Sequence, residues 1–287
     1  MSENQISRSF VKKTDLALKV VTYLVSIGIT ALIIAPFVTM ISGSFVDPAV
    51  KLAGMERPES SITFMEALKM VLTISPVPIG FKNSMIVSVI STVLCIYVSA
   101  LTAYSIVAYD WKLKSALGKF IIITMMIPGN ITMIGYYQLV WKFHLANRLS
   151  MVILPAIAVP IAVYFMKLYL EATLSREVLE SARMDGAGEI RIFNQMILPL
   201  MKPALATQAI FCFLNSWTGN VIQGIVLVKD VKRTLPYCMI DIDMIDPSIA
   251  TMVYGVLTLI SILPPIILFA FLSKDIVEGV QLGAVKY

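Results

Sequence analysis

The feature that most constrains the fold of this chain is a series of long apolar runs without a charged side chain. A run of about 18 or more such residues can cross the hydrocarbon core of a membrane as an α-helix. Within that core a helix satisfies its own backbone hydrogen bonds. We predict six spans: Val20–Ile41, Asn83–Tyr109, Phe120–Trp141, Leu149–Met166, Pro203–Val228 and Pro247–Ser273. The expected fold is therefore an all-α polytopic membrane protein with six transmembrane helices.

Composition supports this class, because 58% of the 287 residues are apolar and only 14% are charged, against about 25% charged in a soluble domain. The first run is too long for the apolar part of a cleavable signal, so we expect an uncleaved first span. We expect a cytoplasmic segment at 1–19, a transmembrane domain at 20–273 and a cytoplasmic tail at 274–287.

The distribution of Lys and Arg predicts the orientation of the chain. If both termini are cytoplasmic, fourteen of the 23 basic residues lie inside, in agreement with the positive-inside rule. This orientation accounts for the net charge of +5, so the charge does not indicate nucleic-acid binding. We expect a multi-pass membrane protein with both termini in the cytoplasm.

One polar segment, residues 171–203, interrupts the apolar runs and is predicted to be an ordered cytoplasmic element; we call it the elbow. Ser175 can cap a helix that has Glu177 in its first turn. Leu174, Val178 and Ala182 then recur at i, i+4 and i+8 and predict one apolar face.

The second half of the elbow is predicted to be a short helix that follows a glycine break. Gly186 can end the first helix in a left-handed conformation. Ile190, Phe193 and Ile197 are expected on one face of the second helix, which Pro199 and Pro203 would terminate. Such a helix-Gly-helix unit is expected to dock against a partner. The alternative without a protein partner is an amphipathic helix that lies on the lipid headgroups.

Several chemistries find no support in the sequence. There is no GxxxxGK[ST] phosphate loop and no Cys/His cluster with metal-ligand spacing. His144, beside Trp141 and Lys142, is interpreted as an interfacial histidine, and Cys95, Cys212 and Cys238 as thiols outside any disulfide framework. The predicted spans lack the ionisable groups that ion-coupled carriers use. We therefore predict a chain that is no enzyme, holds no metal or cofactor, and draws energy from elsewhere.

Two segments carry a resemblance to a known family. Glu180-Ser181-Ala182-Arg183-Met184-Asp185-Gly186-Ala187, followed by Phe193, Ile197, Leu198 and Pro199, resembles the EAA loop of ABC importer permeases. Ser181 replaces the first alanine of that pattern. Residues 276–286, IVEGVQLGAVK, look like the C-terminal ending of carbohydrate importer permeases, especially the smaller six-span subunit of maltose-type systems. Asn215-Ser216-Trp217 lies where many relatives have a W-N-E/D cluster, and Thr218-Gly219-Asn220 departs from it.

This resemblance implies a heteromeric importer of a bacterial-type plasma membrane. The chain would pair with a second permease and with two ATPase subunits that hold ATP and Mg²⁺, and an extracellular solute-binding protein would deliver a saccharide. The elbow would be the coupling helix, with Glu180 paired to a basic residue of the ATPase and Phe193 and Ile197 as apolar anchors. The residues implied in coupling are Glu180, Ala182, Asp185, Gly186, Ala187, Phe193, Ile197, Leu198 and Pro199. Gly279, Gly283 and Lys286 of the tail would contact the ATPases, unless the tail is a frayed terminus.

The translocation path is predicted from polar residues within the spans. Ser216, Asn220 and Gln223 fall at i, i+4 and i+7 of the fifth run, while Asn130 and Tyr137 share a face of the third, where Pro128-Gly129 predicts a kink. Polar groups within spans either line an aqueous path or form hydrogen bonds with neighbouring helices. The external segment Lys229–Asp246 would contact the binding protein or simply connect two spans.

The predicted function is thus the permease subunit of an ATP-driven saccharide importer. Alternatives are an ABC permease for a non-sugar solute, a secondary carrier, and a membrane scaffold or sensor. A secondary carrier would need intramembrane charges or inverted repeats, and a scaffold would need neither the elbow nor the matching tail.

Overall fold

The computed structural model describes residues 18–35, 38, 64–73, 77–240 and 247–284. All regular secondary structure in these ranges is helical. The chain divides into two compact units, Met1–Lys69 with Ile245–Leu259 and Met70–Met244 with Ile260–Tyr287. The all-α prediction is therefore confirmed for the described part of the chain.

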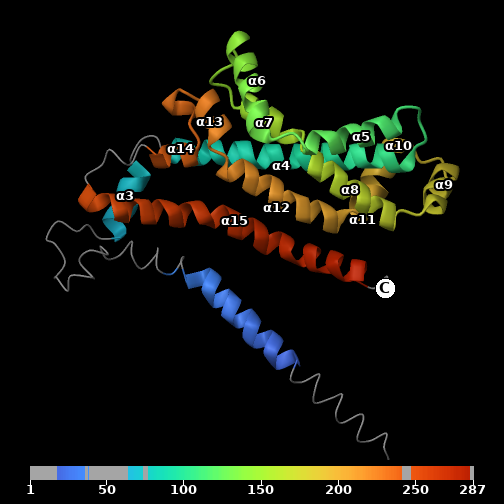
Figure 1. Cartoon of the computed structure of the whole chain (residues 1–287), viewed down its shortest axis with the longest axis horizontal. Coiled ribbons are helices and arrows are strands. Elements are labelled where there is room, and N and C mark those ends of the chain that lie inside the picture. Colours follow the sequence, from blue (N-terminus) through green and yellow to red (C-terminus); the bar gives the residue numbers. More distant parts are fainter. Residues whose placement is uncertain (1–17, 36–37, 39–63, 74–76, 241–246, 285–287) are drawn as a thin grey trace, which may run out of the picture. The chain divides into compact units, whose positions relative to one another are not determined.

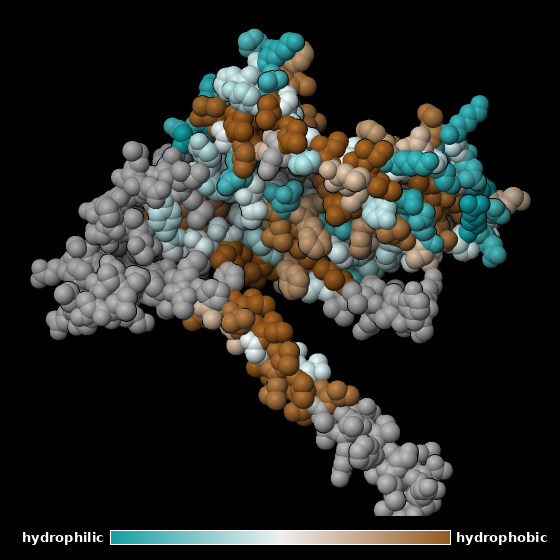
Figure 2. Space-filling model, in the orientation of Figure 1, coloured by the Kyte–Doolittle hydropathy of each residue, from teal (hydrophilic) through white to brown (hydrophobic). Residues whose placement is uncertain are grey.

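The smaller unit contains the Leu18–Ala35 helix, which is long and apolar enough to cross a membrane. Its side chains are exposed along its whole length and are mostly hydrophobic on the face that Figure 2 shows, as expected for a helix that faces lipid. It covers most of the first predicted span, whose last residues lie outside the described ranges apart from Val38. The short helix α3 (Phe64–Thr73) begins in the same unit.

The larger unit is built around α4 (Val77–Ala108), a 32-residue helix that contains nearly all of the second predicted span. It packs against α8 (Pro160–Thr173) and α12 (Lys202–Thr218). Small side chains on the buried face of α4 allow the close approach that helices in a membrane use for association. They are Gly80, Ser84, Ser88, Ser91, Cys95, Ser99 and Ala103. The sulfurs of Cys95 and Cys212 lie 2.8 Å apart where α4 meets α12.

Shorter helices complete the larger unit (Figure 1). Their bounds are α5 Lys114–Met125, α6 Gly129–Lys142, α7 Ser150–Ile157, α9 Arg176–Met184, α10 Glu189–Ile192, the π-helical turn η1 Phe193–Ile197, α11 Leu198–Leu200, α13 Val221–Val226, the 3₁₀ turn η2 Asp230–Lys232 and α14 Leu235–Ile240. The last helix, α15 (Pro247–Ala284), runs through both units. In the larger unit it is tied to α12 by Lys202–Asp275 at 2.7 Å and by a bond from the Trp217 indole to the Ser261 carbonyl at 3.0 Å.

Four described helical segments can cross a membrane by length and composition, or five if one bent pair is counted as a span. The four are Leu18–Ala35, Val77–Ala108, Ser150–Thr173 and Val253–Ile276. The Ser150–Thr173 segment consists of α7 and α8 and extends the fourth predicted span, and Val253–Ile276 overlaps most of the sixth and continues three residues beyond it. The total of six spans remains a prediction.

The third predicted span, Phe120–Trp141, is wrong as a continuous helix. The chain leaves the helical conformation at Pro128 (φ −60°, ψ 125°), so that α5 ends at Met125 and α6 begins at Gly129. A residue before proline is disfavoured in the helical region, and the irregularity falls where we predicted a kink, at Pro128-Gly129, but it separates two helices.

The fifth predicted span, Pro203–Val228, is also not one helix. α12 ends at Thr218 and α13 begins at Val221. Gly219 lies between them, and a Cβ placed there would be 3.0 Å from the Asn215 carbonyl oxygen, so a side chain at this position would require a small shift of that carbonyl. The bent pair is formed instead by Glu189–Leu200 and Lys202–Thr218, whose axes differ by 80°.

Candidate functional site

The elbow is a helix-turn-helix unit whose turn is centred on Gly186. α9 begins after Ser175 and contains Glu177 in its first turn, as predicted, but the Ser175 side chain makes no capping hydrogen bond. Gly186 has a φ of +79°. Its N–H donates to the Arg183 carbonyl at 3.0 Å, and the Ala187 N–H donates to the Ala182 carbonyl at 3.1 Å. These two bonds form a Schellman motif, so the predicted left-handed helix end is confirmed.

The apolar face of α9 differs from the predicted one. Leu179 is its buried residue, flanked by the partly buried Leu174 and Ala182. Val178 is exposed, so its assignment to the inner face is wrong. The periodic pattern located the helix, but contacts with α4 and α8 determine which side of it is buried.

The inward side of the elbow is an apolar floor formed by its own residues Leu179, Ile192, Phe193 and Ile197. These residues pack with side chains of α4 and α8, among them Ala100, Ala103, Met166 and Leu170. Phe193 is only 2% exposed and packs edge-on against Tyr97, with ring centroids 5.5 Å apart. The prediction that Phe193 and Ile197 are surface anchors for a partner is therefore wrong, because both are buried within this chain. Ile190, expected on the same face, is 81% exposed.

The outer surface of the elbow combines charged and apolar side chains. Glu180 and Asp185 are exposed, and so are Met184, at 87%, and Ile190. Hydrophilic side chains gather at this end of the larger unit (Figure 2). Ala187 is partly buried against the floor. This surface is thus chemically suited to a protein partner, with apolar side chains surrounded by charges.

A hydrogen-bonded cluster around Glu189 ties the elbow to the end of α4. The Glu189 carboxylate accepts hydrogen bonds from Tyr104 at 3.1 Å, from Tyr109, and from Arg183 Nε at 2.8 Å. The Arg183 guanidinium also lies 5.2 Å from the centre of the Tyr109 ring. The hydrogen bond and charge of Glu189 raise the pKa of Arg183, despite opposing desolvation. We call these four residues the Glu189 cluster.

The second half of the elbow continues beyond the predicted stop. Pro199 occupies the first turn of α11 and does not end the helix; the break comes at Met201. The π-helical turn η1 runs directly into α11, so Pro199 lies inside a continuous helical segment and, lacking an N–H, donates no backbone hydrogen bond there. Leu198 is partly buried against the floor, and Pro203 begins α12 rather than ending the elbow helix.

Three predicted path residues line one cavity of about 240 Å³ at the break between α12 and α13. These are Ser216, Asn220 and Gln223, joined there by Asn215, Met133 and Pro155. Because the helix is interrupted, the residues do not form the stripe on one helix that we predicted.

Gln223 agrees with the second of the two predicted alternatives, a polar side chain that bonds neighbouring helices. Its Nε2 donates to the Ser216 carbonyl at 3.0 Å, and its Oε1 accepts a hydrogen bond from Thr234. Gln223 therefore bridges the helix break, whereas Asn215 and Asn220 are exposed at the cavity. Tyr137 lies on α6 beside Trp141, with ring centroids 6.0 Å apart. The side chain of Asn130 is outside the description.

The described part of the external segment Lys229–Asp246 packs on the start of α4. Asn83 Nδ2 donates to the carbonyls of Val231, at 3.2 Å, and Arg233, at 2.8 Å. Residues 241–246 lie outside the described ranges. In the tail, Gly279 and Gly283 are part of α15, and Lys286 falls outside the description.

The fold and this site define a polytopic helical membrane protein with an ordered polar elbow between two apolar helices. The family described as "Binding-protein-dependent transport system inner membrane component" matches residues 95–279. The chain belongs to this family, and it is an integral membrane protein.

Curated relatives agree with this assignment. The chain is 35% identical over 215 residues to the arabinooligosaccharides transport system permease protein AraQ of Halalkalibacterium halodurans, covering 72% of this chain and 73% of that protein. It is 29% identical over 209 residues to the melibiose/raffinose/stachyose import permease protein MelC of Bacillus subtilis, covering 72% and 75%.

A solved structure is similar to the fold. A chain of a bacterial ABC transporter involved in the import of the acidic polysaccharide alginate superposes with a TM-score of 0.76 at 20% identity. The match covers 91% of this chain and 97% of that one.

Proposed function

We propose that this chain is the transmembrane subunit of an ATP-driven importer that moves a saccharide delivered by an extracellular binding protein. The observation that carries the proposal is the elbow, with its glycine turn, buried floor and exposed outer surface, in a chain whose relatives include oligosaccharide permeases. In this proposal the chain crosses the membrane six times with both termini in the cytoplasm, and α5 and α6 form a broken third span.

The elbow docks on an ATPase subunit through its outer surface. Met184 and Ile190 supply apolar contact area, and Glu180 pairs with a basic residue of the ATPase. Apolar side chains within a charged rim are the usual anatomy of a protein interface. Asp185, Gly186 and Ala187 fix the turn between the two contact helices. ATP and Mg²⁺ bind to the ATPase subunits.

Movement of the ATPases reaches the membrane helices through two rigid connections. The buried floor joins α9, α10 and η1 to α4 and α8, and the Glu189 cluster joins the elbow to the end of α4. Closely packed elements shift as units rather than deforming continuously. A displacement of the elbow therefore rotates α4, α8 and α12 together and alternates access to the path.

The path passes the cavity at the α12–α13 break, where Asn215 and Asn220 offer amide groups to sugar hydroxyls. Ser216 and Gln223 hold the shape of that cavity, while Asn130 and Tyr137 line the path from α6. A second permease subunit faces this chain across the path. The tail residues Gly279, Gly283 and Lys286 contact the ATPases at the cytoplasmic end of α15.

The proposal is tested with the complete transporter in proteoliposomes. Glu180→Arg should lower ATP-dependent uptake of an arabino-oligosaccharide by about tenfold or more, because loss of one buried interface charge pair costs about 2–5 kcal/mol. Glu177→Arg makes the same charge change one turn earlier on α9, at an exposed residue, and serves as the control. Equal uptake by the Glu180 variant and the control would contradict the coupling role.

A further inference from the structure

A second hollow lies between α5 and α8, next to the start of the elbow. Its volume is about 660 Å³. The last turn of α4 and the apolar side chains Ile121, Ile122 and Val163 form one part of its wall. Arg176 and Leu179 of α9 close one end. All of these residues belong to the larger unit.

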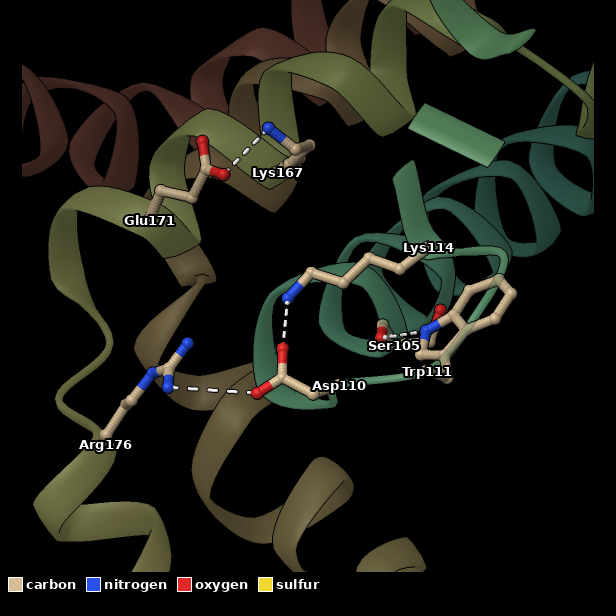
Figure 3. A network of polar contacts seen from close by, with 7 residues as sticks. All are labelled: Ser105, Asp110, Trp111, Lys114, Lys167, Glu171 and Arg176. Carbon is tan, nitrogen blue, oxygen red and sulfur yellow. Dashed lines mark hydrogen bonds and ion pairs between the residues drawn. The ribbon is translucent and has the colours of Figure 1, made fainter. Parts of the chain in front are cut away.

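The polar part of the wall is strongly basic. Five cations line the hollow, namely Lys112, Lys114, Lys119, Lys167 and Arg176, against one carboxylate, Glu171. Lys167 pairs with Glu171 at 2.8 Å and Lys114 with Asp110 at 3.0 Å, while Arg176 lies 4.0 Å from Asp110 (Figure 3). The hydrogen bond and charge of Lys114, together with the charge of Arg176, lower the pKa of Asp110, so the carboxylate that these two cations approach is ionised at neutral pH. The two carboxylates leave three positive charges uncompensated.

Lys112 and Lys119 are the cations available to a ligand. Both are exposed, and neither side chain makes a hydrogen bond or ion pair with another residue of the described part of the chain. Ser115 lies between them in the sequence and also lines the hollow. Their side chains therefore contribute positive charge that no carboxylate of the described chain neutralises.

The hollow also lies at the level where two apolar spans end. The α4 span ends at Ala108, and the span formed by α7 and α8 ends at Thr173; Ala108 and Glu171, both near these ends, line the hollow. Trp111 lines it too, and its indole N–H donates to the Ser105 carbonyl at 3.1 Å (Figure 3). Tryptophan is enriched at the boundary between the hydrocarbon and the headgroups. A ligand here thus meets apolar wall on one side and basic wall at the membrane surface on the other.

We propose that this hollow binds one anionic phospholipid. Its phosphate group faces Lys112 and Lys119, and an acyl chain lies against Ile121, Ile122 and Val163. A soluble phosphate would use the cations but not the apolar wall, and a neutral lipid would use the wall but leave the cations uncompensated. Basic pockets between membrane helices are known receptors for anionic headgroups. Because Arg176 and Leu179 belong to α9, the bound lipid would also hold the first turns of the elbow in place.

The test measures lipid binding directly and does not depend on transport. The full-length chain in detergent micelles is titrated with phosphatidylglycerol or phosphatidylcholine, and native mass spectrometry counts the lipids retained. We expect the wild type to retain one phosphatidylglycerol in preference to phosphatidylcholine. Lys112→Gln/Lys119→Gln should weaken that binding about 30-fold, which corresponds to about 1 kcal/mol for each lysine near a headgroup. Lys119→Arg should retain it.

The matched control is Lys142→Gln, which removes one exposed lysine on α6 that does not line the hollow. Unchanged phosphatidylglycerol binding in the double variant would overturn the proposal. So would an equal loss in the control, since the attraction would then be general. Displacement of the lipid by millimolar inorganic phosphate would assign the site to a soluble anion, and exclusion of the lipid when the ATPases bind would assign the hollow to a protein contact. Either result would refute the lipid site.

Discussion

Replacing Gly186 by alanine tests whether the left-handed turn of the elbow restricts position 186 to glycine. A Cβ at Gly186 would meet no atom within 4 Å, so the change adds no clash, but the φ of +79° is unfavourable for any residue with a side chain. Gly188 offers a matched control, because its φ is −69° and a Cβ there would also meet no atom within 4 Å. Both variants restrict the unfolded chain equally, by about 0.4–1 kcal/mol, and that contribution cancels in their comparison.

The remaining difference is the cost of a left-handed alanine, about 1–2 kcal/mol. This cost should lower the free energy needed to open the turn locally, where the N–H groups of residues 186 and 187 donate to the carbonyls of Arg183 and Ala182. Hydrogen exchange of a peptide covering residues 183–190, corrected for intrinsic rates, should therefore be roughly 5- to 30-fold faster in Gly186→Ala than in Gly188→Ala. Gly186→Asn should fall between them, because asparagine tolerates this conformation. Equal exchange in the two alanine variants would refute the role assigned to Gly186.

Two further predictions concern the connections behind the elbow and the path. Glu189→Gln should weaken the contact between the elbow and α4 by about 1 kcal/mol, because the Arg183 and Glu189 side chains are 35% and 45% exposed and their interaction is partly screened. Uptake per ATP hydrolysed should therefore fall, while binding of the ATPases persists. The control Glu177→Gln should change neither quantity. A loss of ATPase binding in Glu189→Gln would instead make Glu189 part of the docking surface. Gln223→Ala should leave the buried Thr234 hydroxyl and Ser216 carbonyl without their partner, at a cost of about 2–4 kcal/mol, seen as a lower melting temperature of the purified protein. Asn220→Ala, at an exposed residue of the same cavity, should melt like the wild type; equal melting of both variants would contradict the bridging role of Gln223.

The parts of the fold that sequence predicted best are those governed by local chemistry. Gly186 was identifiable because few other residues accept a left-handed helix end, and Pro128 because proline disfavours a helix at the residue before it. Long charge-free runs located α4 and the apolar part of α15, because an apolar run of that length can cross a membrane as a helix. These features depend on residues close together in the chain.

The wrong predictions concern side chains whose burial is set by residues far away in the sequence. Leu179 rather than Val178 faces inward because α4 and α8 cover that side of α9, and no periodicity within nine residues contains that information. Glu189 was not singled out because its partners Tyr104 and Tyr109 are 85 and 80 residues away. For Gln223 the sequence left lining of the path and hydrogen bonding between helices both open, and its bond with Thr234 supports the second.

The burial of Phe193 and Ile197 changes how the elbow is understood. A sequence pattern shared with a family shows which residues matter, but it does not show whether they face a partner or support the surface from beneath. Here the aromatic residue is covered by Tyr97 and Tyr104, and the exposed contacts are Met184 and Ile190.

The most direct test of the account is purification of the tagged full-length chain from its native membrane, followed by mass spectrometry of the intact assembly. We predict recovery of a second permease subunit and two ATPase subunits, with the ATPases reduced by Met184→Glu/Ile190→Glu and retained by the control Val231→Glu, which changes an exposed side chain of η2, outside the membrane spans and away from the elbow. Recovery of the wild-type chain without any ATPase, under conditions that keep the membrane subunits together, would contradict the central claim.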